Sequence, residues 1–264
     1  MAAVKEVYGF LDQLAPFSTQ MDFDNAGFLV GRGAAGAERI LVALDITEEV
    51  VREAAELGCQ LIVSHHPVIF HPARSITDET VTGRVLLALT EQRIAAICAH
   101  TNLDTAQGGV NDCLAAALEL TEVGQLHQDG VDAQGRPYGI GRVGMAHRPG
   151  MTAGEYAAFV KGKLGAASVR FADSGRPVQK VAVGGGSCGS MLADALAAGC
   201  DTFVTADVKY DQYLEAKALG ITLMDAGHYA TENVVCAPLA EQLARRFPEA
   251  EVLLSRHREV YEGV

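Results

Sequence analysis

The chain has 264 residues, of which 49% are apolar and 20% charged, and its formal net charge is −12 at pH 7. These fractions are those of a globular protein and argue against wholesale disorder. The best apolar run, Ile40 to Ile46, contains Asp45 and falls short of the ~18 residues that a membrane span needs. The acidic balance opposes non-specific binding to nucleic acid or to an anionic membrane. We therefore expect one large domain or two small ones, with neither a membrane nor nucleic acid as partner.

The cysteines occur singly and mostly within apolar runs: Cys59, Cys98, Cys113, Cys188, Cys200 and Cys236. None belongs to a Cys-x-x-Cys pair, so neither a disulfide framework nor a zinc ribbon is expected. The N-terminal segment carries Lys5, Glu6 and Asp12 and lacks the apolar stretch of a secretory signal. These features predict a cytoplasmic protein.

The first half of the chain alternates helical and strand patterns, which is typical of α/β architecture. Thr47 is a suitable N-cap for a helix that ends at Gly58, with two acids in its first turn. In chain order, the other predicted elements are a helix from Val4 to Leu14, a strand from Ile40 to Leu44, a strand from Leu61 to Val63, a helix from Glu79 to Gln92, a strand from Ile94 to Cys98 and a helix from Gly108 to Leu118.

After Leu126 the pattern lapses, and the polar stretch from Gln128 to Pro137 is the best candidate for a linker. Order resumes with a strand near Gly139 to Val143, a helix with Thr152 and Glu155 as capping box, a strand near Val169 and a strand from Val178 to Val183. We therefore predict a first domain over residues 1–127 and a second over residues 128–264, whose C-terminal segment returns to a cleft shared by both.

Residues 40–67 align without gaps on residues 181–208, at an offset of 141. Five positions are identical, and the order of strand, helix, Gly-Cys and strand coincides. Any two strand–helix–strand units share some of these features. We favour an internal duplication that produces two similar α/β domains.

Three clusters of polar side chains directly follow predicted strands. They are Ser64-His65-His66-Pro67, His100-Thr101-Asn102-Leu103-Asp104 and Gly227-His228-Tyr229-Ala230-Thr231-Glu232. In an open α/β sheet, ligands bind beyond the carboxyl ends of the strands. Imidazoles and carboxylates are ligands for zinc, iron, manganese and similar ions. The shared position of the clusters therefore predicts a metal site.

His65 and His66 are adjacent, and neighbouring side chains of a straight strand point to opposite faces. They can serve one ion only where the chain bends. Two ions, each bound by one histidine, would also satisfy this geometry, with Asp104 and Glu232 as bridging carboxylates. His228 lies four residues before Glu232, so the two share one face where a helix begins.

Each cluster also has an ordinary explanation. A His-His pair is more often structural than metal-binding, His100 can simply end a strand, and Glu232 can be a favourable acid in a first helical turn. The coincidence of three clusters at strand ends favours the metal site. The remaining histidines lie in turns or polar segments and are expected at the surface: His71, His127, His147 and His257.

A Gly-x-Gly-x-x-Gly motif, Gly184 to Gly189, follows a strand and precedes a helix. This placement suits an anion at a helix N-terminus. The strand is not N-terminal, and Asp207 is only an approximate candidate for the ribose-binding acid about 20 residues further on. Dinucleotide binding is therefore disfavoured, whereas anion binding stays open. Asp207 also ends the duplicated strand where the first half has His65 and His66, so it can face the same cleft.

Taken in order, these motifs resemble those of the GTP cyclohydrolase I type 2 homologs, also called Ngg-one-interacting-factor-three-like, dinuclear-metal-centre proteins. Besides the three clusters, the similarity is carried by Asp24-Asn25-Ala26-Gly27, Ala43-Leu44-Asp45 and Gly109-Val110-Asn111-Asp112, and it covers nearly the whole chain. The departures from the family pattern are Phe23 in place of Trp, Ala206 in place of Gly, and the loop Gly186-Ser187-Cys188-Gly189. None of them removes a candidate ligand.

The resemblance implies two similar α/β domains with a dinuclear metal cleft between them. The metal ligands it implies are His65, His66, Asp104, His228 and Glu232, with His100 close by. The cofactors would be two divalent ions of zinc, iron or manganese. Members of this family commonly assemble as toroidal homohexamers, trimers of dimers, and we expect the same here. At 264 residues, the chain is expected to lack the domain that some members insert in mid-chain.

Functions of different classes remain open. A metal-dependent hydrolase of a nucleotide or phosphorylated small molecule, GTP cyclohydrolase-type activity included, would use a metal-bound hydroxide, with His100 or Asp207 shuttling protons. A non-catalytic metal-binding protein, either a chaperone or a regulatory partner, would use the same ligands without turnover. A nucleic-acid-binding ring is the weakest hypothesis, because the net charge of −12 opposes it unless the lumen of the ring is basic.

Overall fold

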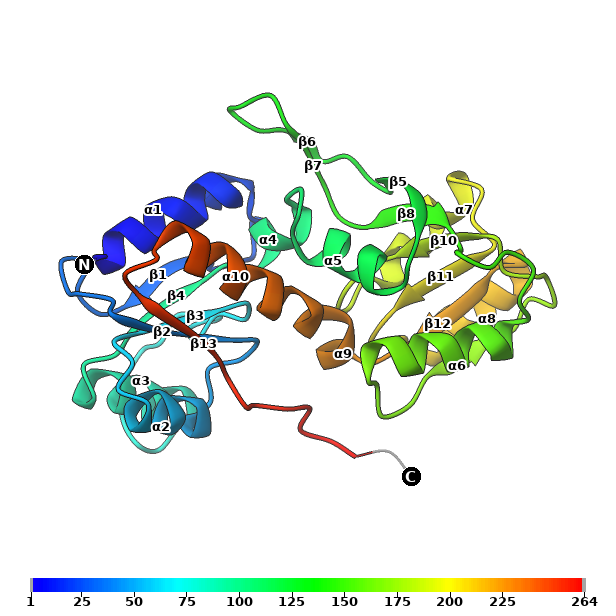
Figure 1. The fold of residues 1–264 in the computed structure, drawn as a ribbon. Coiled ribbons are helices and arrows are strands. Elements are labelled where there is room, and N and C mark those ends of the chain that lie inside the picture. The colour runs from blue at the N-terminus through cyan, green and yellow to red at the C-terminus, as the bar shows by residue number, and fades with distance from the viewer. Residues whose placement is uncertain (1, 263–264) are drawn as a thin grey trace. The chain divides into compact units, whose positions relative to one another are not determined.

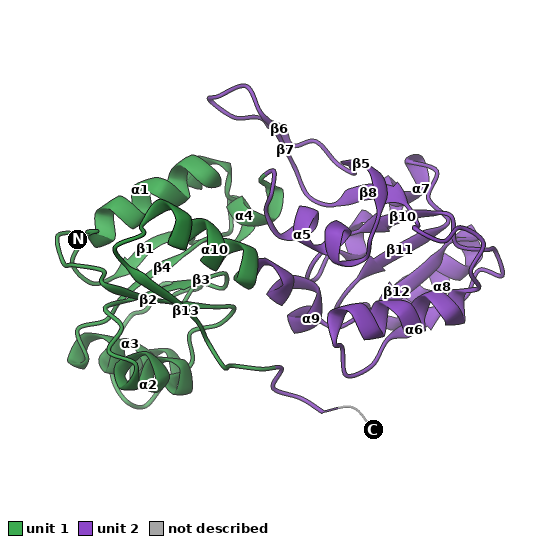
Figure 2. Ribbon diagram, viewed as in Figure 1, with its two compact units in different colours: residues 1–106, 236–258 green, residues 107–235, 259–264 purple. Residues whose placement is uncertain are grey.

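The computed structural model describes residues 2–262 and divides the chain into two units (Figures 1 and 2). Residues 1–106 and 236–258 form unit 1, and residues 107–235 and 259–264 form unit 2. Each unit is built around a mixed sheet with helices on its faces. The predicted α/β class is therefore confirmed.

The sheet of unit 1 has five strands in the order β1-β4-β3-β2-β13. They are β1 (Gly27–Val30), β2 (Arg39–Ala43), β3 (Leu61–Ser64), β4 (Ala95–Cys98) and β13 (Glu251–Leu254). Neighbouring strands run parallel except β1, which is antiparallel to β4. Every residue of the inner strands β3 and β4 is buried, which explains their almost continuously apolar sequences.

Helices cover both faces of this sheet (Figure 1). They are α1 (Val4–Leu14), the 3-10 turn η1 (Phe17–Thr19), α2 (Glu48–Glu56), α3 (Val81–Glu91), α4 (Thr101–Thr105) and α10 (Cys236–Arg246). Helices α2 and α3 pack on the face that presents Leu41 and Ile62. The Oγ1 of Thr47 accepts the N–H of Val50 (3.2 Å), which confirms the predicted N-cap of α2.

The division of the chain differs from the predicted one, which placed residues 1–127 in the first domain and 128–264 in the second. The chain leaves unit 1 after Ala106 and returns to it at Cys236. The return follows from strand pairing, because β13 lies parallel to β2 at the edge of the unit 1 sheet, with Leu253 opposite Leu41. Unit 1 is therefore built from two segments that are distant in sequence.

The predicted linker over residues 128–137 is instead part of unit 2, where it forms a hairpin of β6 (Gly130–Val131) and β7 (Pro137–Tyr138). The carboxylate of Asp132 accepts the backbone N–H groups of Gln134 and Arg136, each at 2.9 Å. These bonds satisfy the backbone of the turn, so a polar, glycine-containing stretch is ordered without apolar packing.

The sheet of unit 2 has six strands in the order β5-β8-β10-β11-β12-β9. They are β5 (Thr121–Gln125), β8 (Arg142–Met145), β9 (Arg170–Ala172), β10 (Lys180–Val183), β11 (Thr202–Thr205) and β12 (Thr222–Asp225). The central strands β10, β11 and β12 run parallel, and the flanking pairs are antiparallel.

Alternate residues of the central strands face two separate cores. Val204 packs with α5 (Val110–Ala117) and α6 (Ala153–Leu164), whereas Phe203 packs with α7 (Leu192–Ala197) and α8 (Tyr210–Leu219). The period of two along a strand accounts for this division. The remaining elements are η2 (Gly189–Met191), α9 (His228–Glu232) and η3 (Asn233–Val235).

The two stretches that align at an offset of 141 residues form the same pairing in each unit. In unit 1, Val42 lies opposite Val63 in the parallel pair β2–β3. In unit 2, Val183 lies opposite Val204 in the parallel pair β10–β11. Each helix between the paired strands is followed by a glycine with positive φ. Both aligned stretches therefore form a parallel strand–helix–strand unit.

No helix among residues 2–262 is long and apolar enough to cross a membrane.

Candidate metal centre

Unit 1 brings three histidines together. His65 and His66 follow β3, and His100 follows β4, which is the parallel neighbour of β3. Their potential ligand nitrogens all lie within 4.8 Å of one another. The chain bends after β3, where the Ser64 hydroxyl donates to the carbonyl oxygen of His66 (2.8 Å). The bend lets two adjacent imidazoles approach the same space, which a straight strand would prevent.

Asp104 lies next to this histidine cluster. It is on α4, one turn after His100, and its Oδ1 is 3.5 Å from Nε2 of His65. The side chain of His65 is fully buried and that of Asp104 is 12% exposed. Burying a carboxylate is costly unless positive charge or hydrogen bonds compensate. This donor set therefore suits a cation.

Unit 2 presents a second pair of ligands. His228 and Glu232 lie at the two ends of α9, and Nε2 of His228 is 3.0 Å from Oε2 of Glu232. The side chain of Glu232 is 5% exposed and that of His228 is 34% exposed. The predicted placement of the two residues on one helix face is therefore confirmed.

Each of these four histidines has its Nδ1 next to a hydrogen-bond acceptor. The partners are the Ala99 carbonyl oxygen for His65 (2.8 Å), Asp45 for His66 (2.7 Å), Asp24 for His100 (2.7 Å) and Asp207 for His228 (2.7 Å). An acceptor at Nδ1 places the proton there, so Nε2 carries a lone pair that is available to a metal or to a proton. Histidine ligands of metals almost always have such a partner. The histidine cluster of unit 1 thus fits a divalent ion, and unit 2 presents two further potential ligands.

The order of the strands in each sheet places these acceptors next to their histidines. Asp45 follows β2, the parallel neighbour of β3, and Asp207 follows β11, the parallel neighbour of β12. Carboxyl ends of adjacent parallel strands meet at one edge, so residues far apart in sequence become bonded there. Asp207 was a sequence candidate for proton transfer, and the structure places it as the partner of His228.

Hydrogen bonds hold Asp24, the acceptor of His100, in its ionised form. Burial opposes its charged form, but hydrogen bonds from His100 and Thr101 outweigh this effect and lower the pKa of Asp24 to about 2. Thr101 donates both its backbone N–H (3.0 Å) and its hydroxyl (2.5 Å). Asp24 therefore carries a full negative charge at neutral pH and fixes the orientation of His100.

The sequence did not assign roles to Asp45 and His257. Nε2 of His257 lies 3.5 Å from Oδ2 of Asp45, and its side chain is 9% exposed. The expectation that His257 is a surface residue is therefore wrong, because the segment after β13 carries it to the edge of the sheet. Asp45 directly follows a predicted strand, as the three polar clusters do, so the same pattern indicates it as a candidate. No local sequence pattern indicates a role for His257.

The other histidines expected at the surface differ among themselves. His71 and His127 are exposed. His147 is partly buried and stacks on Phe159, with ring centroids 4.5 Å apart.

The glycine motif from Gly184 to Gly189 supports Glu232. Its N–H donors bond within unit 2: Gly184 to Val204 O (3.0 Å), Gly185 to Asn111 Oδ1 (2.9 Å), Gly186 to Thr231 Oγ1 (3.0 Å) and Cys188 to Thr205 Oγ1 (3.1 Å). These N–H groups already donate hydrogen bonds to acceptors of unit 2, which disfavours anion binding by the loop. A Cβ on Gly186 would lie 2.0 Å from Oε1 of Glu232, so the glycine leaves room for the carboxylate.

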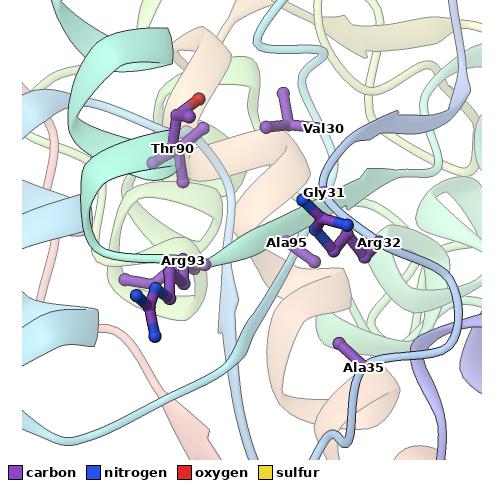
Figure 3. A pocket seen from close by; sticks show the side chains of 9 residues that line it. Val30, Gly31, Arg32, Ala35, Thr90, Arg93 and Ala95 are labelled. Atoms are coloured by element: carbon purple, nitrogen blue, oxygen red, sulfur yellow. The ribbon is translucent and has the colours of Figure 1, made fainter.

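Unit 1 has a cavity of about 500 Å³ whose lining includes none of the clustered histidines. Figure 3 shows this cavity from close by. Val30, Thr90 and Ala95 line it, together with the side chains of Arg32 and Arg93. It lies at the amino end of β4, whereas the histidines follow the carboxyl ends of the strands.

The sequence matches the Duf34/NIF3 (NGG1p interacting factor 3) family over residues 2–259. The chain belongs to this family. It is 39% identical over 247 residues to a Streptomyces coelicolor member named GTP cyclohydrolase 1 type 2 homolog, covering 92% of this chain and 86% of that one. It is 32% identical over 243 residues to a Helicobacter pylori member named GTP cyclohydrolase 1 type 2, covering 92% of each.

A solved structure, that of a Staphylococcus aureus hypothetical protein, is similar with a TM-score of 0.92 at 30% identity and covers 99% of both chains. The family that the motifs predicted is therefore confirmed, as is the α/β fold.

Proposed function

We propose that this member of the Duf34/NIF3 family is a metal-dependent hydrolase. The proposed ligands of its two divalent ions are His65, His66, Asp104, His228 and Glu232. The observation that carries the proposal is the occupied Nδ1 of each histidine in this set, which directs Nε2 to a metal. A mixture of imidazole and carboxylate ligands suits zinc, iron or manganese. Asp104 and Glu232 are proposed as the bridging carboxylates.

When bound, such ions lower the pKa of a water molecule and stabilise a developing oxyanion. The protein's own contribution begins with orientation, since Asp45 and Asp207 hold His66 and His228 by their Nδ1 atoms. We assign proton transfer to Nε2 of His100 rather than to Asp207. His100 donates Nδ1–H to the ionised Asp24, which is how a carboxylate orients a general base and stabilises its protonated form.

The proposed substrate is a nucleotide or a phosphorylated small molecule. The names of the relatives support it, because they refer to a GTP cyclohydrolase. The test is a turnover screen of nucleotides and phosphoesters with zinc, iron or manganese, using wild type and Glu232→Ala. We expect a product that requires metal and is lost in the variant. The absence of any metal-dependent product would refute the hydrolase. Transfer of bound metal to an acceptor apoprotein would then identify a metal carrier.

We further propose that the protein is a homohexamer, on the basis of the family resemblance. We also propose that it is cytoplasmic, on the basis of its single, scattered cysteines. Light scattering should give a particle of six chains, each of 27.8 kDa. A monomer in this measurement would refute the assembly, and cell fractionation would test the location.

A further inference from the structure

Two exposed aromatic rings of unit 1 lie beside the histidine cluster. Phe23 is 64% exposed and Phe70 is 38% exposed, with ring centroids 6.4 Å apart. Phe70 also meets the ring of His100 edge to face at 6.0 Å. We call Phe23 and Phe70 the aromatic platform. One exposed apolar side chain needs no explanation, but a contiguous pair next to a candidate site indicates a binding role.

Hydrogen bonds of neighbouring residues hold the segments that carry the aromatic platform, while the two rings stay exposed. Nδ2 of Asn25 donates to the carbonyl oxygen of Ile69 (2.5 Å), which joins the two segments that carry the rings. The carboxylate of Asp24 accepts Nδ1–H of His100 (2.7 Å), which ties the first segment to the histidine cluster. The rings are thus fixed relative to the imidazoles although most of the surface of Phe23 remains open.

Phe70 belongs to the long connection between β3 and α3, residues 65–80. Every residue from 70 to 80 is exposed. Connections longer than about 12–15 residues without regular structure are uncommon and usually functional. This connection begins with His65 and His66, so Phe70 is close in sequence to two candidate metal ligands.

We propose that the aromatic platform stacks against a planar heteroaromatic ring of the substrate, of the nucleobase class, and so holds that ring beside the histidine cluster. The two phenylalanine rings meet at 65° rather than face to face, which leaves ring surface for a third aromatic group. Asp22 and His71 next to them are exposed and polar. The small apolar patch therefore suits a single ring better than a protein face of about 800 Å².

This inference rests on the proposed function, because it concerns the substrate of the proposed metal centre. Its test is a binding measurement. Calorimetry would compare guanosine 5′-monophosphate with ribose 5-phosphate, which lacks the base, on wild type, Phe23→Leu and Phe70→Leu. Leucine keeps the apolar character and removes the aromatic face. We expect each variant to bind guanosine 5′-monophosphate about tenfold more weakly, within the range of base–aromatic stacking, and ribose 5-phosphate as wild type does.

Phe171→Leu is the matched control, because Phe171 is 39% exposed and lies on β9 of unit 2. It should bind both probes as wild type does. The platform proposal is overturned if wild type does not bind guanosine 5′-monophosphate, or if both platform variants bind it unchanged. Equal losses for the two probes would also overturn it. A changed particle mass with unchanged affinity would instead identify the rings as a contact between copies of the chain.

All titrations would be made with zinc-loaded and zinc-free protein, with the zinc content measured separately. Retention of zinc without any effect of the platform variants would overturn this inference alone. Failure to bind zinc would refute the metal centre. The ratio of wild-type to variant affinity for guanosine 5′-monophosphate would still test the platform.

Discussion

Gly186 leaves the space that the carboxylate of Glu232 occupies. A Cβ at Gly186 would lie 2.0 Å from Oε1 of Glu232, and the φ of this glycine is +64°. Gly186→Ala should therefore displace the carboxylate as well as strain the backbone. We expect metal affinity to fall about tenfold or more and stability to fall by about 1–2 kcal/mol. Calorimetric zinc titration and urea unfolding measure the two effects.

Gly165→Ala separates strain from displacement. Gly165 has almost the same φ, +63°, and a Cβ there meets nothing within 4 Å. This variant should lose stability and keep its zinc affinity. Equal zinc affinities in the two variants would contradict the supporting role of Gly186.

Asp104→Ala and Glu232→Ala each remove a proposed bridging carboxylate. Because both side chains are nearly buried and face a histidine, each variant should lose most of its bound metal. Elemental analysis after dialysis measures the metal per chain, and circular dichroism confirms the fold. Glu241→Ala, at an exposed position of α10, is the control and should retain its metal. Full occupancy in both bridging variants would refute these roles.

Asp45→Asn and Asp207→Asn remove the negative charge that faces Nδ1 of His66 and of His228, while the side-chain shape is kept. Loss of such partners lowers metal affinity by about 10–100-fold, because the imidazole is less well oriented and less basic. Competition with a chelator would measure the change.

Asp194→Asn is the control for these two variants, since Oδ1 of Asp194 lies 3.0 Å from Nδ1 of His127, a histidine outside the proposed set. A similar drop in this variant would mean that net charge, rather than orientation, sets the affinity.

Glu53 on α2 anchors the segment that follows β13. It accepts hydrogen bonds from Oγ of Ser255 (2.6 Å) and from the backbone N–H (3.0 Å) and Nε (2.9 Å) of Arg256. Burial alone would raise the pKa of Glu53, but these bonds and the charge of Arg256 lower it below its ordinary value. Hydrogen bonds to charged groups contribute about 1.5–3 kcal/mol, so Glu53→Gln should reduce stability by an amount of this order at neutral pH.

The pH dependence of this effect has a definite sign. Since the folded pKa of Glu53 is below the unfolded value, its stabilisation is fully present above about pH 4.3 and is lost as the pH falls through the folded pKa. Urea unfolding near neutral pH and near pH 3 should show the difference between wild type and Glu53→Gln shrinking. Glu56→Gln, at an exposed position of the same helix, should have little effect at either pH. A constant difference for Glu53→Gln would contradict this account.

Local signals predicted the inner elements well. The N-caps at Thr47 and Thr152 were found because a capping bond joins residues only three positions apart. The edge strands β1 and β13 were missed, since each has an apolar run of only three residues, Phe28 to Val30 and Val252 to Leu254. The polar pattern of residues 128–137 predicts a linker, whereas hydrogen bonds of Asp132, rather than apolar residues, order them as a hairpin.

The family, the α/β class and the clusters of imidazole and carboxylate at the ends of strands can be predicted without the structure, because these depend on residue type and short spacing. Which acid each imidazole faces depends on the folded chain. Asp24 and His100 are 76 positions apart, and Asp45 and His66 are 21 positions apart. The return of β13 to unit 1 was decided in the same way. Such pairings arise when distant segments meet at one sheet edge, and no local pattern encodes them.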